Sequence, residues 1–335
     1  MKILVFGSNS KWAIENAFLE YLRINNDIIF LNGHGSFLSY YHKNILNKIF
    51  FRMGLSTIFS KINKDLLKLT IMHKPDAIIV FKGMEIFPKT LMKINRIGIP
   101  LLNYNADHPF EYMSRGSGNK NVLNSIKYYQ HHFSYSKKIV DQIKKKYNIS
   151  ASWLPFAYFQ AHPPKNEILN SVCFIGNPDT ERVCVIKLLL KNNIAVDLYG
   201  NNWDKFINSS ENLKIHKPVY SNDFNKIAQQ YRVQLNIFRP HNYDSHNMRT
   251  FEMPALGCIM LAPYSSEHIS LFKENEEAFY YKNDKELIGK CKLILQLNED
   301  EAFKIKTNAY NRSINSNYSY KDRSKQILNQ IEKFL

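Results

Sequence analysis

Short apolar runs and longer segments of helical periodicity alternate along this chain. Runs such as 2–6, 77–81 and 99–104 end in glycine or in a polar turn. Between them lie segments such as 88–95, whose apolar positions recur every three to four residues. This alternation is typical of parallel sheets covered by crossover helices, so the sequence predicts an α/β fold. Polar loops at the carboxyl ends of such strands are where these sheets bind ligands.

The same design begins again in the second half of the chain. Residues 171–177 form an apolar run that ends in Gly176 and Asn177, as 2–6 ends in Gly7. Further helices are predicted at 12–23, 180–191, 222–231, 248–256, 285–297, 299–308 and 320–334, and 66–73 is predicted to be the end of another. Further strands are predicted at 27–31, 195–199, 233–238 and 258–262. The simplest account is two Rossmann-like domains that face each other across a cleft. We expect them at 1–155 and 156–317, with a terminal helix at 318–335 that packs back on the first domain.

Composition narrows the class of protein without deciding it. A chain of 335 residues that is 44% hydrophobic can bury the cores of two domains. The formal net charge of +16 favours an anionic partner, which can be nucleic acid, a phosphorylated substrate or a membrane surface. The four cysteines form no CxxC pair, which favours buried small hydrophobes in a reducing compartment over a disulfide or zinc site. With no run near the roughly 20 apolar residues that cross a bilayer, we expect a cytoplasmic protein.

The densest polar cluster of the sequence is the stretch 241–252, a loop that leads into a helix beginning near Met248. The start of a helix offers unpaired N–H groups and Arg249 adds a cation, so a diphosphate is a natural occupant. Glu252, one turn further on, is placed to accept hydrogen bonds from hydroxyl groups. The structural alternative is that Arg249 and Glu252 form a pair three residues apart on the helix surface.

The stretch Asn-Met-Arg-Thr-Phe-Glu at 247–252, followed by a small-residue turn and a strand up to Leu261, resembles a known family. It is similar to the signature of bacterial GT-B glycosyltransferases related to the spore-maturation-protein group. The segments 172–177 with Arg182 and 196–200 with Trp203 fit the same pattern. The resemblance runs from about 172 to the C-terminus, and more loosely through the first half. It is specific for fold and enzyme class, and not for the identity of the sugar.

The resemblance implies a nucleotide-sugar donor site in the second domain. Glu252 is expected to hold the ribose hydroxyls, while Arg249 and the Gly176 loop approach the diphosphate. The donor-binding residues expected are Gly176, Asn177, Arg182, Tyr199, Gly200, Asp244, Asn247, Arg249, Thr250, Phe251 and Glu252. Because arginines and helix-end N–H groups can stabilise the departing diphosphate and the sequence has no Asp-x-Asp motif, we expect no metal and no cofactor.

Two stereochemical outcomes stay open. Asp244 and Glu252 have seven residues between them, which resembles the acidic pair of many retaining GT-B enzymes. If the reaction inverts, Asp107 or His108 can take the proton of the acceptor hydroxyl, since both follow a predicted strand of the first domain. The structural alternative is that Asp107 only caps a polar turn before Pro109.

The positive charge has a candidate location in the first domain. Residues 40–53 mix aromatic, aliphatic and cationic side chains as an interfacial helix does, and Lys137, Lys138 and 144–146 add positive surface. Docking on an anionic bilayer to reach a lipid-linked acceptor fits this composition. An ordinary helix with solvated lysines fits it as well.

The leading hypothesis is a glycosyltransferase that moves a sugar from a nucleotide sugar to a saccharide or lipid-linked acceptor in bacterial surface-glycan synthesis. It would work in the cytoplasm, with peripheral contact to the inner face of the membrane. A non-hydrolysing nucleotide-sugar epimerase can share the fold, and a non-catalytic binding module is a further alternative. The charge alone would also suit a nucleic-acid-binding protein, but the sequence has no zinc-finger spacing and no RNA-recognition signature, so we expect no nucleic-acid partner.

Overall fold

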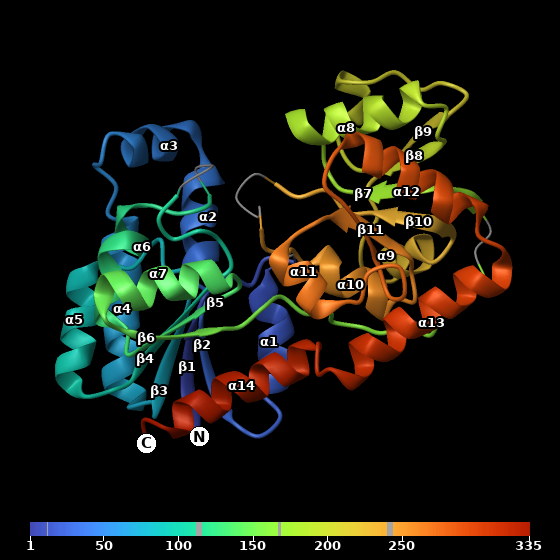
Figure 1. Ribbon diagram of the computed structural model, residues 1–335. Coiled ribbons are helices and arrows are strands. Elements are labelled where there is room, and N and C mark those ends of the chain that lie inside the picture. Colours follow the sequence, from blue (N-terminus) through green and yellow to red (C-terminus); the bar gives the residue numbers. More distant parts are fainter. Residues whose placement is uncertain (12, 112–115, 167–168, 240–243) are drawn as a thin grey trace. The chain divides into compact units, whose positions relative to one another are not determined.

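The computed structural model describes residues 1–11, 13–111, 116–166, 169–239 and 244–335 (Figure 1). The chain forms two compact units, one made of Met1–Pro155 with Tyr320–Leu335 and the other of Phe156–Ser319. Each unit contains a six-stranded sheet in which every recorded pairing of neighbouring strands is parallel. The predicted α/β class with two Rossmann-like sheets is confirmed.

The first sheet has the strand order β2-β1-β3-β4-β5-β6. Its strands are β1 (Lys2–Phe6), β2 (Asp27–Leu31), β3 (Ala77–Phe81), β4 (Leu101–Asn105), β5 (His131–Ser134) and β6 (Ser150–Trp153). The chain moves from β1 to β2 on one side and then to β3 on the other, so the order reverses between β1 and β3. In open sheets of this kind, ligands bind beside the carboxyl ends of the two strands at that reversal.

The helices of the first unit differ in how many apolar positions they bury. They are α1 (Ile14–Leu22), α2 (Gly33–Lys43), α3 (Ile45–Arg52), α4 (Ile58–His73), α5 (Pro88–Ile97), α6 (Lys120–Ser125), the 3-10 turn η1 (Ile126–Tyr128), α7 (Lys137–Tyr147) and the terminal α14 (Tyr320–Glu332). The terminal helix packs on α1, as predicted, because the Tyr320 ring lies 5.2 Å from the ring of Phe18. Ile327 and Ile331 are completely buried.

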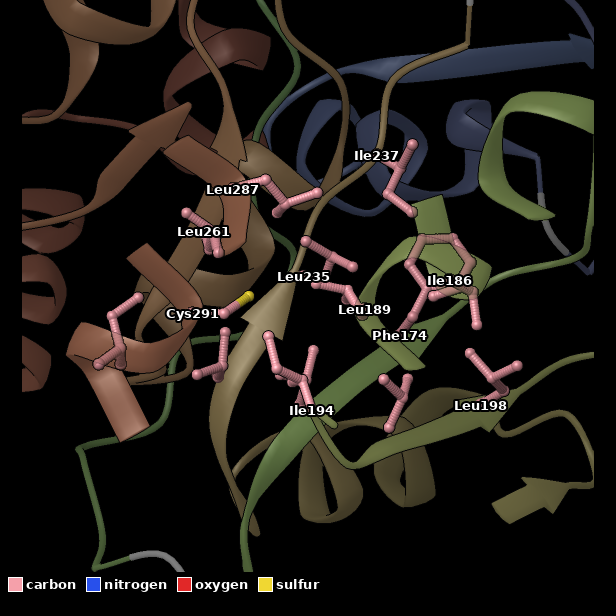
Figure 2. Close-up of a cluster of buried hydrophobic side chains, with 14 of the residues drawn as sticks. Phe174, Ile186, Leu189, Ile194, Leu198, Leu235, Ile237, Leu261, Leu287 and Cys291 are labelled. Carbon is pink, nitrogen blue, oxygen red and sulfur yellow. The ribbon is translucent and has the colours of Figure 1, made fainter. Parts of the chain in front are cut away.

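The second sheet has the order β12-β11-β10-β7-β8-β9 and reverses between β7 and β10. Its elements are β7 (Leu169–Ile175), α8 (Thr180–Lys191), β8 (Val196–Tyr199), η2 (Trp203–Lys205), β9 (Leu213–His216), α9 (Ser221–Ala228), β10 (Tyr231–Leu235), α10 (Arg249–Ala255), β11 (Met260–Pro263), α11 (Ser266–Leu271), β12 (Phe279–Tyr281), α12 (Asp284–Gln296) and α13 (Glu299–Asn315). Figure 2 shows apolar side chains from β7, β8, β10, α8 and α12 gathered in its core. This core fixes the strand ends that carry the polar loops.

The prediction of one helix over residues 40–53 is wrong. The chain forms two helices there, α2 and α3, because Asn44 is extended at φ −160° and its side chain accepts the N–H of Asn47 at 2.8 Å as a helix cap.

Cys173, Cys258 and Cys291 are buried and all four cysteines are free thiols. No helix in the described ranges is both long enough and apolar enough to cross a bilayer. Trp12, placed by prediction in the first helix, lies outside the described residues.

Candidate functional site

The reversal of the second sheet brings the ends of β7 and β10 side by side. Gly176 follows β7 directly, and its carbonyl accepts the indole N–H of Trp203 at 2.8 Å. A Cβ atom on Gly200 would lie 2.2 Å from the same carbonyl oxygen, so only glycine fits at 200. Asn177 supports the neighbouring loop, because its Oδ1 accepts the backbone N–H of Asn201 at 2.9 Å. The loops at Gly176 and Gly200, both predicted to bind the donor, thus form two turns that pack against each other.

Arg182 ties the two strand ends together from the first turn of α8. Its Nη1 donates to the carbonyl of Asn177 at 2.8 Å, and its Nη2 reaches the carbonyl of Ile237, beyond β10, at 3.5 Å. Asp179 caps the helix by accepting the Arg182 N–H at 3.0 Å and lies 3.3 Å from its Nε. The guanidinium of Arg182 is therefore fixed at the reversal of the sheet.

Two other guanidinium groups lie within electrostatic range of Arg182. Burial lowers the pKa of Arg182, Asp179 opposes that effect, and the positive charges of Arg239 and Arg249 lower the pKa of Arg182 further. Arg239 follows β10 and Arg249 opens α10, so the three cations come from separate segments. Such a concentration of positive charge is suited to a diphosphate.

Arg249 and Glu252 form an ion pair on α10. On the sequence alone, this pair is the alternative to ligand binding by the two side chains. Nη1 of Arg249 donates to a carboxylate oxygen of Glu252, and the guanidinium lies 4.3 Å from the ring centre of Phe224. The two side chains keep 32% and 18% of their surface exposed. Both groups are thus oriented and still within reach of a ligand.

Asn247 and Thr250 are committed to bonds that fix the start of α10. The amides of Asn236 and Asn247 pair reciprocally at 3.0 and 2.7 Å. The hydroxyl of Thr250 donates to Nε2 of His268 at 2.7 Å, while Nδ1 of His268 donates to the carbonyl of Pro263 at 2.8 Å. Burial lowers the pKa of His268 to about 3, so the ring is neutral. These side chains position Arg249 and Glu252.

Three other residues predicted to bind the donor have structural contacts. Phe251 is completely buried and packs against the ring of His246 at 5.3 Å. The hydroxyl of Tyr199 pairs with that of Tyr231 at 2.8 Å inside the unit. Asp244 is exposed, adopts φ +59° and accepts the backbone N–H of Ser266, the first residue of α11, at 3.1 Å. The part of the predicted polar loop at 241–243 lies outside the described residues.

The reversal of the first sheet also carries a pocket, of about 200 Å³, that lies at the ends of β1, β3 and β4. It is lined by Ser8, Ser10, Ala13, Ile14, Glu15, His34, Phe81, Lys82, Glu85, Tyr104, Ala106 and Asp107. Nζ of Lys82 lies 2.5 Å from Oδ2 of Asp107, and Nδ1 of His34 lies 2.7 Å from Oε1 of Glu85. Burial raises the pKa of Glu15, whose Oε1 accepts the N–H of Ser8 at 2.9 Å.

The structure separates the two candidate bases. Asp107 lines this pocket, whereas His108 lies beside a second hollow of about 500 Å³ with Phe110, Glu111, Gln142, Lys145 and Lys146. Nδ1 of His108 accepts the backbone N–H of Glu111 at 3.0 Å, and burial lowers the pKa of His108. The carboxylate of Asp107 is paired with Lys82, and the turn is instead closed by Asn105, whose Oδ1 accepts the Asp107 N–H at 3.0 Å.

Several residues of these sites were not singled out from the sequence. Arg239 could have been found, because it follows a predicted strand at the edge where ligands bind. Glu15, His34 and Glu85 carry no local signal, since only the folded chain brings them to Lys82. Within the part of the chain that the structure describes, no group of three or more His, Cys, Asp or Glu side chains is arranged to hold a metal ion.

Comparison with known proteins adds a family match over part of the chain. Residues 182–329 match a family described as glycosyl transferase-like, a stretch that contains Arg182, Arg239, Arg249 and Glu252. No curated protein sequence matches the chain. The match agrees with the enzyme class predicted from the sequence.

Solved structures with low sequence identity share the fold. Anabaena Alr3699/HepE, crystallised in complex with UDP-glucose, is 12% identical over 99% of this chain and all of its own, with a TM-score of 0.65. S. aureus TarM is 13% identical with a TM-score of 0.59, over 76% of this chain but only 54% of TarM, so the chain spans about half of that protein. A Listeria monocytogenes putative UDP-N-acetylglucosamine 2-epimerase is 13% identical over 99% of this chain and 95% of its own, with a TM-score of 0.58. These likenesses show a two-domain GT-B fold.

Proposed function

We propose that this chain is a glycosyltransferase that transfers a sugar from a nucleotide-sugar donor to a saccharide or lipid-linked acceptor in bacterial surface-glycan synthesis. The observation that carries the proposal is the guanidinium of Arg182, fixed at the reversal of the second sheet within electrostatic range of Arg239 and Arg249, with Glu252 paired to Arg249. The family match over 182–329 supports it. The motif at 247–252 supports placing the enzyme near the spore-maturation-protein-like group.

The donor would bind on the second unit. A departing nucleoside diphosphate gains negative charge in the transition state, and fixed guanidinium groups stabilise that charge most when they need not reorganise. Arg182 and Arg249 are held in place by Asn177 and Phe224. We therefore propose a metal-independent transfer without a cofactor, in which Glu252 accepts the ribose hydroxyls.

The acceptor would bind on the first unit, in the pocket that Asp107 lines. In an inverting transfer Asp107 takes the proton of the attacking hydroxyl, with Lys82 orienting the carboxylate. His108 is the weaker candidate, because one of its nitrogens already accepts the Glu111 N–H. We place the reaction in the cytoplasm, at the inner face of the membrane when the acceptor is lipid-linked.

Nucleotide-sugar epimerisation is the second candidate, because the Listeria structure described as a putative epimerase covers nearly the whole chain. The two activities differ in one requirement, since an epimerase needs no acceptor. Turnover of a nucleotide sugar to its epimer in the absence of any acceptor would replace our proposal by this one.

A thermal-shift screen tests the donor site. UDP, GDP, CMP, dTDP and their sugars are added with EDTA present, where a ligand at about 100 times its Kd stabilises by about 2.7 kcal/mol. We expect one nucleotide to raise Tm, and Glu252→Ala to abolish that rise. The matched control is Glu276→Ala, which breaks an exposed pair with Lys273 at the same i,i+3 spacing and should keep the response. No response to any nucleotide would overturn the proposal.

A further inference from the structure

Helix α3 exposes apolar side chains along one whole face. Ile45, Leu46, Ile49, Phe50 and Met53, which closes the helix, are exposed by 72%, 57%, 44%, 45% and 65%. At 100° per residue they fall within an arc of about 140°. We refer to these five residues as the α3 face. Since α3 contains no buried residue at all, this face is not part of the core.

The opposite side of α3 is anchored to the unit. Phe51 points about 170° away from the middle of the α3 face. Its ring lies 4.8 Å from that of Phe37, 5.3 Å from that of Phe59 and 5.7 Å from that of Tyr41. Figure 1 shows α3 at the periphery of the first unit, beyond α2. The helix is therefore held by one aromatic cluster and presents its apolar face outward in a fixed orientation.

The charged residues of the segment that carries the α3 face have one sign. Residues 28–64 contain no Asp or Glu, and their fixed charges are Lys43, Lys48, Arg52, Lys61 and Lys64. Lys48 and Arg52 lie on the helix itself, about 60° and 20° beyond Ile45 at one edge of the face. Nζ of Lys48 lies 5.8 Å from the ring centre of Tyr41. A surface that is apolar in the middle and purely cationic at its edge complements an anionic lipid headgroup layer above acyl chains.

We propose that the α3 face inserts into the interface of an anionic lipid bilayer and holds the first unit there. Apolar side chains enter the boundary between headgroups and acyl chains, while Lys48 and Arg52 remain at the level of the phosphates. A second copy of the chain is a poorer occupant, because a symmetric contact would bring the lysines and arginines of both copies together. The inference extends the proposed function to a membrane, but it holds whether or not sugar is transferred.

Vesicle binding of the full chain tests this inference without any sugar substrate. Co-sedimentation is measured with vesicles of phosphatidylcholine alone and of phosphatidylcholine with phosphatidylglycerol. We expect binding that requires phosphatidylglycerol and weakens with salt. Ile49→Ser with Phe50→Ser should weaken binding at least about tenfold, and Lys48→Gln with Arg52→Gln about fivefold for each charge removed.

The matched control is Ile71→Ser with Met72→Ser, a pair on α4 of the same unit that is exposed by 61% and 58% and should bind as the wild type does. A tryptophan placed by Phe50→Trp should shift its emission to shorter wavelength when anionic vesicles are added. Equal binding by the α3 variant and the control would overturn the proposal. So would absence of binding to anionic vesicles, or a dimer in solution that the Ile49 and Phe50 changes dissociate.

Discussion

The two units build the same kind of sheet and put opposite chemistry at the same place. Each sheet reverses its order beside its first strand, between β1 and β3 in one and between β7 and β10 in the other. At the first reversal the pocket contains the carboxyl groups of Glu15, Glu85 and Asp107. At the second, Arg182 lies within electrostatic range of Arg239 and Arg249. The architecture therefore gives the location of a site, and the side chains at the strand ends decide what binds there.

The largest expected effect tests the carboxylate side of this comparison. Asp107→Asn keeps the shape of the side chain but removes the base, so we expect the turnover number to fall by about 10²–10⁴-fold while nucleotide binding stays unchanged. Acceptor-dependent transfer kinetics measure it. Glu111→Gln, which alters a carboxylate outside the pocket, should leave the rate within about twofold. Normal turnover by Asp107→Asn would rule out Asp107 as the base and favour a retaining mechanism.

A substitution at the arginines of the second unit should impair nucleotide binding as well as transfer. Arg249→Gln removes one of the three cations, so we expect transfer to fall by about 10²–10³-fold and the affinity for the nucleotide to fall as well. Arg312→Gln is a suitable control, because this arginine of the same unit pairs with Glu277 and donates to the carbonyl of Leu271. If Arg249→Gln bound the nucleotide as tightly as the wild type, the three-arginine site would not be the diphosphate site.

The third prediction is that the stability of the two units depends on pH to different extents. Burial lowers the pKa of His131 and His132 to about 4 in the first unit, and that of His268 to about 3 in the second. The unfolded chain takes up these protons below about pH 6.5 and the folded chain does not, so stability falls as the pH drops from about 6.5 towards 4. The first unit should lose about 1.4 kcal/mol per pH unit for each of these two histidines, with His108 acting in the same direction, and the second unit for one.

Urea unfolding at several pH values, followed through Trp153 in the first unit and Trp203 in the second, measures this difference. A steeper loss in the second unit, or no loss in either between pH 6.5 and 5, would contradict the assignment of neutral buried histidines.

The smallest effect sharpens the role of the paired glycine turns. Gly200→Ala should destabilise the second unit by about 1–3 kcal/mol, because its Cβ would lie 2.2 Å from the carbonyl oxygen of Gly176. Gly289→Ala, in α12, meets no atom within 4 Å and should stabilise by about 0.5–1 kcal/mol. Thermal unfolding compares them. Equal effects would mean that the turn at Gly200 relaxes freely.

Much of the fold follows from local sequence. The strands β1, β2 and β3 and the helix α8 begin and end at the predicted residues, because their apolar runs are bounded by charged or turn-forming residues. β5 was not predicted, since it opens with two histidines, and only tertiary packing makes His131 and His132 buried. The break at Asn44 was missed because the composition on both sides is the same and one capping hydrogen bond decides it.

The contacts of the candidate sites also divide into those that local sequence predicts and those that only the fold creates. Arg249 and Glu252 lie within one helical turn, so their pair could be anticipated from spacing alone. The contact between Lys82 and Asp107 joins the ends of two strands. It depends on the register of β3 against β4, which pairs Phe81 with Tyr104 and which no local pattern specifies. Contacts of this kind, made by the fold as a whole, are those that sequence reasoning could not supply.

The helix α14 makes the first unit discontinuous in the gene. A fragment that ends at Pro155 would lack the buried side chains of Tyr320, Ile327 and Ile331, and the ring of Phe18 would lose its contact with Tyr320. The second unit, in contrast, is one uninterrupted segment. A ribosome therefore releases the complete second unit before it releases α14, and the first unit cannot finish folding until that helix has emerged.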